Sequence, residues 1–155
     1  MAEREAKIIK KKIVLASGTF DLLHLGHVRY LEEAKKAGGK NAMLVVIVAK
    51  DKTVEKRKRK KPVIPEEQRR TLVESLKVVD KAILGYEAFD MNKVIDKIKP
   101  DVIAVGYDQN NIEERVRKTV EEKGSGIQVV KIKRFGKTEL NSSRKIKKKV
   151  KQLYR

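Results

Sequence analysis

The chain has 155 residues, a formal net charge of +18 and no cysteine. The lack of cysteine excludes a disulfide scaffold, a thiol nucleophile and a cysteine-based zinc site. No apolar run is long enough to span a bilayer, and residues 1–12 lack the apolar core of a signal peptide. We therefore expect a cytoplasmic protein with no membrane partner. The length predicts a single domain over 1–155, with a basic N-terminal extension over 1–11 and a basic C-terminal helix and tail over 142–155.

The first half of the chain alternates apolar and amphipathic segments. The apolar run Ile13–Ala16 predicts a strand, and the amphipathic run Val28–Lys36 predicts a helix. Ala42–Ala49 is a continuous apolar run rich in β-branched residues, which is typical of a central strand buried on both faces. The basic stretch Lys50–Lys61 that follows it is expected to be a loop.

The second half continues this alternation. Pro65 in a first turn, followed by two glutamates, predicts a helix that carries Leu72, Val73 and Leu76 inward. We expect further strands at 81–85, 101–106 and 127–132, helices at 91–99 and 112–123, and a last helix capped by Ser142 or Ser143. Strands joined by helical crossovers predict an α/β, Rossmann-like domain in which about five parallel strands carry helices on both faces.

Four polar segments follow predicted strands. Ligands of open parallel sheets bind at the carboxyl ends of the strands, so we expect these segments to converge on one edge. They are Gly18–His27, Lys50–Lys61, Gly106–Gln109 and Phe135–Ser143.

The segment Gly18–His27 carries both histidines of the chain, His24 and His27, at a strand-to-helix junction. A helix N-terminus offers free backbone amides and the positive end of the helix dipole, which suits phosphate. Gly26 lets the backbone approach a ligand closely. The pair is expected to stabilise negative charge on a bound phosphate rather than to act as a nucleophile. A histidine-based zinc site is the alternative, but no cysteine or third histidine supports it.

Other candidate residues follow the later strands. Lys50 and Arg57 are expected to reach the phosphate of a second substrate, although a solvated loop explains most charges there. Asp108 can accept hydrogen bonds from a ribose hydroxyl or a base amino group, or simply form a turn. Ser142 and Ser143 precede a helix, where they form either a second phosphate cradle or ordinary N-caps.

The run Gly18-Thr19-Phe20-Asp21-Leu22-Leu23-His24-Leu25-Gly26-His27 resembles the GTFDxxHxGH signature of the HxGH nucleotidyltransferases, in their cytidylyltransferase-like branch. Residues 137–143 depart from the RTEGISTT pattern of cytidylyltransferases. Stretches at 48–54, 63–69, 82–87, 100–109 and 139–143 instead resemble the archaeal-type FAD synthases, which join the AMP of ATP to FMN. The resemblance covers most of residues 12–146.

This resemblance implies ATP and FMN as substrates, a divalent cation such as Mg²⁺, and a homodimer. It also implies catalytic roles for the two histidines. The resemblance implies ATP contacts at Thr19, Phe20, His24, Leu25, Gly26, His27 and Asp108. Gly18, Ser142 and Ser143 complete the set of predicted nucleotide-binding residues.

Two alternatives stay open. One is a cytidylyltransferase acting on a small phosphorylated alcohol such as glycerol phosphate. The other is a nucleic-acid-binding protein that uses the basic runs at 7–12, 56–61 and 144–155. The intact Gly18–His27 segment favours an enzyme without specific nucleic-acid recognition, because binding of a phosphate backbone does not require that segment.

Overall fold

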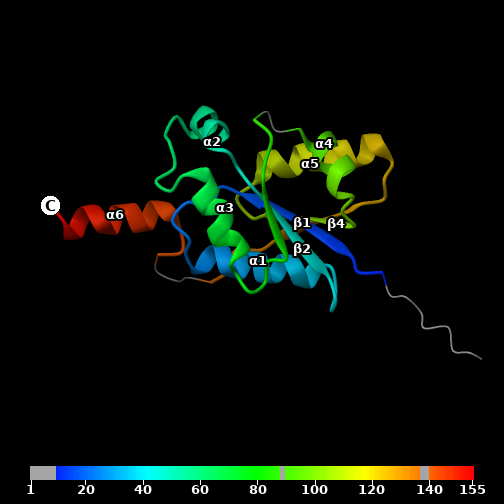
Figure 1. Cartoon of the computed structure of the whole chain (residues 1–155), viewed down its shortest axis with the longest axis horizontal. Coiled ribbons are helices and arrows are strands. Elements are labelled where there is room, and N and C mark those ends of the chain that lie inside the picture. Colours follow the sequence, from blue (N-terminus) through cyan, green and yellow to red (C-terminus); the bar gives the residue numbers. More distant parts are fainter. Residues whose placement is uncertain (1–9, 88–89, 137–139) are drawn as a thin grey trace, which may run out of the picture.

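Five parallel strands form the centre of the molecule (Figure 1). The computed structural model describes residues 10–87, 90–136 and 140–155. The strands are β1 (Ile13–Gly18), β2 (Met43–Val48), β3 (Lys81–Leu84), β4 (Val102–Gly106) and β5 (Gln128–Ile132). They lie in the order β3-β2-β1-β4-β5, and every neighbouring pair is parallel. The predicted α/β sheet is therefore confirmed.

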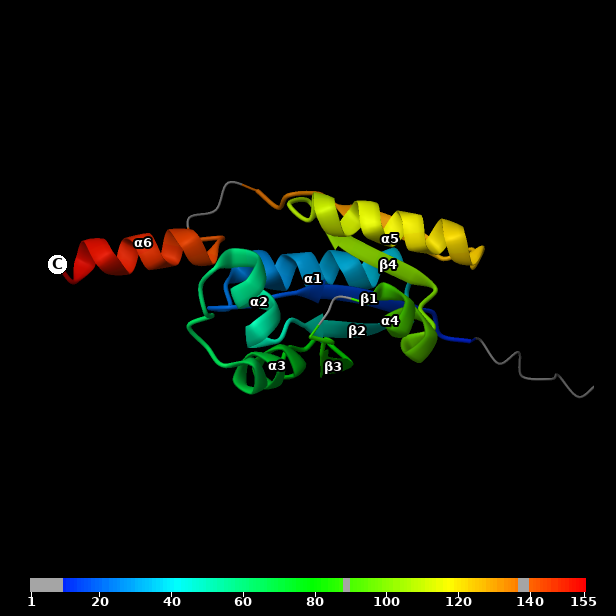
Figure 2. The same ribbon diagram turned by 90° about the horizontal axis from the view of Figure 1, so that it is seen from above.

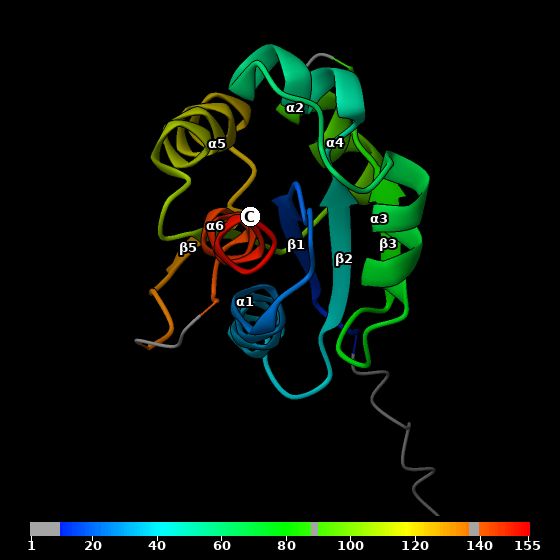
Figure 3. The ribbon, with the colours of Figure 1, turned by 90° about the vertical axis from the view of Figure 1, so that its left-hand side faces the viewer.

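Helices cover both faces of this sheet, as predicted. The helices are α1 (Leu25–Ala37), α2 (Asp51–Lys58), α3 (Glu66–Glu74), α4 (Met91–Ile98), α5 (Asn110–Lys123) and α6 (Ser143–Leu153). Leu31 of α1 and Val73 of α3 pack into the apolar core on one face. Val94 of α4 and Val116 of α5 pack into the core on the other face. Figure 3 shows α1 and α5 on opposite sides of β1.

The strand β1 lies between β2 and β4, with Val14 paired to both Leu44 and Val102. Chain connections leave the middle of the sheet in opposite directions: α1 leads from β1 outward to β2 on one face, and α5 leads from β4 outward to β5 on the other. A crevice outside the carboxyl ends of β1 and β4 follows from this topology.

The prediction of a loop over Lys50–Lys61 was wrong, because most of it forms α2. Asp51 in the first turn and three basic residues in the last turn both interact favourably with the helix dipole, and Val54 is buried beneath the helix. Arg59 ends the helix in a left-handed conformation, with φ of 55°. A stretch whose many charges predicted a loop thus forms a helix with a defined start and end.

The inward placement of Leu72 was also wrong, since its side chain is 46% exposed. The inner face of α3 carries Arg69 and Val73, and Leu76 continues this line beyond the helix. Leu72 lies beside this line and faces solvent. The sequence pattern did not reveal that an arginine occupies a core position.

The helix α6 extends away from the sheet and ends at the C-terminus (Figures 1 and 2). The predicted cap is confirmed at Ser142, whose hydroxyl oxygen accepts a hydrogen bond from the amide of Lys145 at 3.2 Å. Most of the predicted N-terminal extension lies outside the described residues. Over the described ranges, no helix combines the length and apolarity needed to cross a membrane.

Candidate active site

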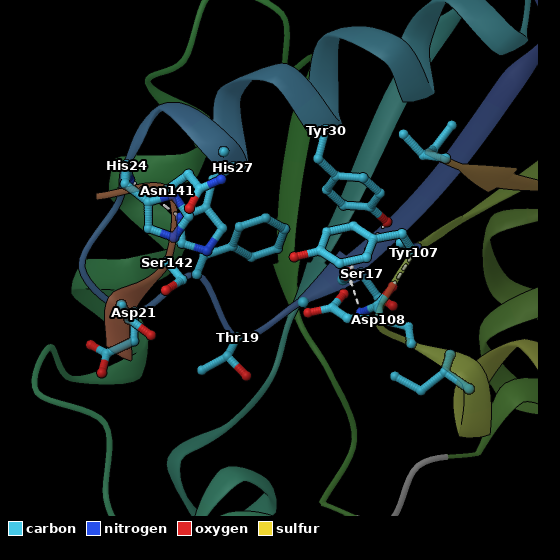
Figure 4. A pocket seen from close by; sticks show the side chains of 18 of the residues that line it. Ser17, Thr19, Asp21, His24, His27, Tyr30, Tyr107, Asp108, Asn141 and Ser142 are labelled. Atoms are coloured by element: carbon cyan, nitrogen blue, oxygen red, sulfur yellow. Dashed lines mark hydrogen bonds between the residues drawn. The ribbon is translucent and has the colours of Figure 1, made fainter. Parts of the chain in front are cut away.

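A cavity of about 630 Å³ opens at the carboxyl ends of β1 and β4 (Figure 4). All four predicted polar segments contribute to its lining, so they converge as expected. The predicted site residues that line it are Gly18, Thr19, Phe20, His24, Gly26, His27, Arg57, Asp108, Ser142 and Ser143. Residues 137–139, which carry part of the predicted second cradle, lie outside the described residues.

Two predicted residues do not line this cavity. Leu25 is the first residue of α1, and its side chain is exposed. Lys50 directly precedes α2 and lines a separate hollow of about 260 Å³ beside Tyr86 and α4. The structure therefore places Arg57, and not Lys50, in the cavity that the histidines line.

The two histidines form a compact pair at the start of α1. Their rings are stacked, with centroids 3.7 Å apart and an angle of 21° between the planes. The backbone amide of His24 donates to Nδ1 of His27 at 3.3 Å, which fixes the second ring against the helix N-terminus. The buried ring of Phe20 packs against His27, with centroids 5.3 Å apart. Figure 4 shows the pair beside Asn141 and Ser142.

The environment keeps both rings neutral at pH 7. Burial, the neighbouring His24 and the charge of Lys58 together lower the pKa of His27 to about 3, against an opposing effect of Asp21. Burial also lowers the pKa of His24. Because Nδ1 of His27 accepts a hydrogen bond, the proton of the neutral ring must lie on Nε2. His27 thus presents a neutral Nε2–H donor.

The depressed pKa of His27 predicts that stability falls as pH falls below 6.5, because the unfolded chain gains a proton that the folded chain excludes. The loss continues toward the folded-state pKa and amounts to at most about 1.4 kcal/mol per pH unit. Urea unfolding at pH 7 and pH 5 measures this effect. We expect His27→Gln to reduce the difference between the two pH values. Equal losses in both proteins would contradict the buried neutral ring.

The N-terminal ends of α1 and α6 meet at the cavity, with Gly26 at the point of contact. A Cβ atom at Gly26 would lie 2.7 Å from the carbonyl oxygen of Asn141 and 2.9 Å from the His24 ring. Only glycine permits this approach, so residue 26 is a glycine because any larger side chain would clash there. The amides of His27 and Lys145 already donate to His24 and Ser142, but the first two amides of each helix have no acceptor within their own helix. Two sets of amide donors therefore face one cavity, which suits a ligand with several phosphates.

We expect Gly26→Ala to lower turnover at least about tenfold, because the methyl group must displace either the His24 ring or the segment that leads into α6. The expected loss in thermal stability is small, since the cavity can accept the displaced segment. Steady-state kinetics and a melting curve measure the two effects. An unchanged turnover would show that this close approach does not matter to catalysis.

The turn after β4 forms the opposite wall of the cavity. Gln109 fixes this turn, since its side chain accepts from the amide of Gly106 at 2.8 Å and donates to the carbonyl of Ser17 at 3.1 Å. Asp108 is left exposed to the cavity, so its carboxylate is free to accept hydrogen bonds. Tyr107 is 45% exposed on the same wall (Figure 4).

Several cavity cations were not singled out by the sequence patterns. Lys58, the last residue of α2, lines the cavity, and its side chain remains exposed. Partial desolvation lowers its pKa, and the nearby cations Arg57 and Lys147 lower it further, whereas Asp21 and Asp108 raise it. An ammonium group placed among other cations is stabilised by a bound anion. In sequence, Lys58 is one of six consecutive basic residues, and only the helical phase of α2 distinguishes it.

The fold and the cavity can be compared with known proteins. The family model described as cytidylyltransferase-like matches residues 15–149. This chain belongs to the cytidylyltransferase-like family. The sheet order and the helix N-termini described above are therefore those of a member of this family.

Curated relatives of this cytidylyltransferase-like chain are similar over nearly their whole length. A protein of Ferroglobus placidus named FAD synthase is 53% identical over 135 residues, which cover 87% of this chain and 85% of the relative. A FAD synthase of Methanothermus fervidus is 51% identical over 139 residues, covering 90% and 94%. A Thermoplasma volcanium crystal structure, described as the lipopolysaccharide core biosynthesis protein, matches with a TM-score of 0.73 and 42% identity, over 82% of this chain and all of the other.

Proposed function

We propose that this chain transfers the AMP moiety of ATP to FMN, giving FAD and pyrophosphate. The observation that carries the proposal is the high identity to FAD synthases over most of the chain. It is supported by the cavity, whose lining includes every residue of Gly18–His27 except the three leucines Leu22, Leu23 and Leu25. Neither a cytidylyltransferase acting on a small alcohol nor a nucleic-acid-binding protein is favoured by these relatives.

The reaction is an in-line displacement at phosphorus. A phosphate oxygen of FMN attacks the α-phosphorus of ATP, the bond from that phosphorus to the bridging oxygen breaks, and pyrophosphate leaves with the electron pair. The chain needs no covalent intermediate, so it acts by positioning both phosphates and stabilising the charge that develops. We assign this stabilisation to His24 and His27 as neutral donors, with Lys58 as a cation.

The two helix N-termini suit the triphosphate, and the opposite wall suits the nucleoside. Ser142 and Ser143 lie at the start of α6, beside Gly26. Asp108 can accept a hydrogen bond from the ribose or the adenine amino group. Arg57 lies on the α2 side of the cavity, and we assign it to the phosphate of FMN.

A divalent cation, Mg²⁺, is part of the proposal. In the described part of the chain, no three His, Cys, Asp or Glu side chains are grouped so as to hold a metal ion. The residues therefore fit a cation carried by the triphosphate and water, with at most one carboxylate such as Asp108. When bound, such a cation neutralises phosphate charge. The homodimer, the cytoplasmic location and the lack of specific nucleic-acid binding stay predictions.

Product analysis tests the proposal. The purified protein is incubated with ATP and FMN, with CTP and FMN, and with CTP and glycerol phosphate, and the products are separated by chromatography. We expect FAD from ATP and FMN, and its loss when EDTA removes divalent cations. Turnover of CTP with glycerol phosphate, without FAD from the first mixture, would contradict the proposed acceptor.

A further inference from the structure

Arg69 is a fully buried arginine outside the cavity lining. It lies on the inner face of α3 with an exposure of 0%. A buried guanidinium group is costly unless its donors are all used, and those of Arg69 serve three different segments. Its Nε donates to the carbonyl of Ile64 at 2.8 Å, Nη1 to the carbonyl of Thr19 at 2.6 Å, and Nη2 to the carboxylate of Asp51 at 2.6 Å.

Asp21 also links the segment before α1 to the segment before α3, but with the acceptor on the first segment and the donors on the second. Its carboxylate, also buried, accepts hydrogen bonds from the amides of Val63 and Ile64, both at 2.9 Å. The Gly18–His27 loop also contains two non-glycine residues with positive φ, Phe20 at 56° and Leu22 at 52°. Such backbone conformations persist only where surrounding contacts enforce them. The contacts of Asp21 and Arg69 supply that enforcement.

Arg57 is the cavity residue that depends on this arrangement. Its guanidinium donates to the side-chain hydroxyl of Thr19 at 3.0 Å, and the carbonyl of that same residue is held by Arg69. Arg57 also lies on α2, whose first residue, Asp51, is paired with Arg69. Arg69 therefore takes part both in the contact through Thr19 and in the anchoring of α2, the two features that place the Arg57 guanidinium.

We propose that Arg69 is a positioning residue for the transfer reaction, which acts by holding Arg57 in place relative to the histidine pair. The proposal rests on the proposed function only in taking Arg57 to meet a substrate phosphate. It makes the loop before α1 and the helix α2 a single preorganised unit, so that both phosphate-facing sides of the cavity keep a fixed separation.

A double-mutant cycle between Arg69→Lys and Arg57→Ala tests the proposal. Lysine keeps the positive charge beside Asp51 but cannot serve all three acceptors. We expect Arg69→Lys alone to lower kcat about tenfold, and to lower it less than about twofold in the Arg57→Ala background, because coupled residues do not act additively. If the loss in kcat of the double variant equals the product of the two single losses, the substitutions act independently and the proposal is overturned.

Arg70→Lys is the matched control on the same helix. Arg70 pairs with Glu67 and Glu74 and lies outside the cavity lining, so we expect kcat to stay within about twofold of the unmodified protein. If Arg69→Lys melts below the assay temperature, Asp51→Asn replaces it in the cycle, because it weakens the contact with α2 and leaves the other two Arg69 contacts. The same non-additivity is expected, and additivity would again overturn the proposal.

Calorimetric titration with ATP and with FMN separates this proposal from the proposed function. If the protein makes no FAD, the proposed function fails. The double-mutant cycle is then measured on binding affinity, using whichever of ATP and FMN binds more weakly to the Arg57→Ala variant. Non-additive affinities would still support the positioning role. Additive affinities, or no effect of Arg57→Ala on either ligand, would overturn it.

Discussion

Replacing His27 with alanine is expected to lower kcat by about a hundredfold or more, the scale of losing one preorganised donor in a transition state. The reason is the fixed tautomer, since the His24 amide occupies Nδ1 and leaves the Nε2–H group as the donor toward the cavity. His24→Ala should have a loss of similar size, because the two rings are stacked and line the same cavity. Substrate affinity should weaken much less than turnover, which steady-state kinetics and calorimetric binding measure together.

The control for both histidine variants is Leu25→Ala. Leu25 lies between the histidines, but its side chain is exposed and outside the cavity lining, so we expect nearly normal turnover. Melting curves show whether each variant is folded at the assay temperature. A protein with both histidines replaced that keeps near-normal turnover would refute the catalytic assignment.

Lys58→Ala is expected to have the second large effect, a loss in kcat on the order of a hundredfold. Lys58 lies at the cavity wall, where partial desolvation and the cations Arg57 and Lys147 lower its pKa, so a bound phosphate supplies the negative charge that this group of cations lacks. Because its ammonium group lines the cavity, it can contact that phosphate, whereas a lysine elsewhere on the surface cannot. Kinetics over a range of ATP and FMN concentrations determine which substrate depends on it.

Lys52→Ala is the matched control for Lys58 on the same helix. Lys52 lies outside the cavity lining, and its ammonium group is 3.5 Å from the carboxylate of Glu87 at the molecular surface. Removing it deletes the same charge from α2, so a general effect of net charge would appear in both variants. We expect kcat to change less than about twofold, in line with other surface substitutions. Equal losses in the two variants would contradict a local role for Lys58.

The sequence predicted those features that depend on neighbouring residues. Continuous apolar runs such as Ala42–Ala49 indicated buried parallel strands, and a strand-to-helix junction placed His24 and His27 at a helix N-terminus. Local capping chemistry likewise limited the cap of α6 to Ser142 or Ser143, of which Ser142 is the N-cap. In each case the physical signal lies within a few residues, so it can be read without knowing the fold.

Features that depend on distant contacts or helical phase were not predicted. Lys50 and Lys58 are indistinguishable in a basic run until α2 gives them different directions. Arg69 looks like a surface residue of a charged helix, because its partners Thr19 and Asp51 are 50 and 18 residues away in sequence. A buried arginine is recognisable only after the three acceptors have been brought together.

Isotope tracing tests the central claim most directly, that this chain moves the α-phosphoryl group of ATP together with its adenosine. The protein is incubated with FMN and ATP labelled either at the α-phosphate or at the γ-phosphate, and the products are separated. The account predicts that α-label appears in FAD and γ-label in pyrophosphate, in equal amounts. Label from the γ-position in a flavin product, or release of ADP without formation of FAD, would contradict it.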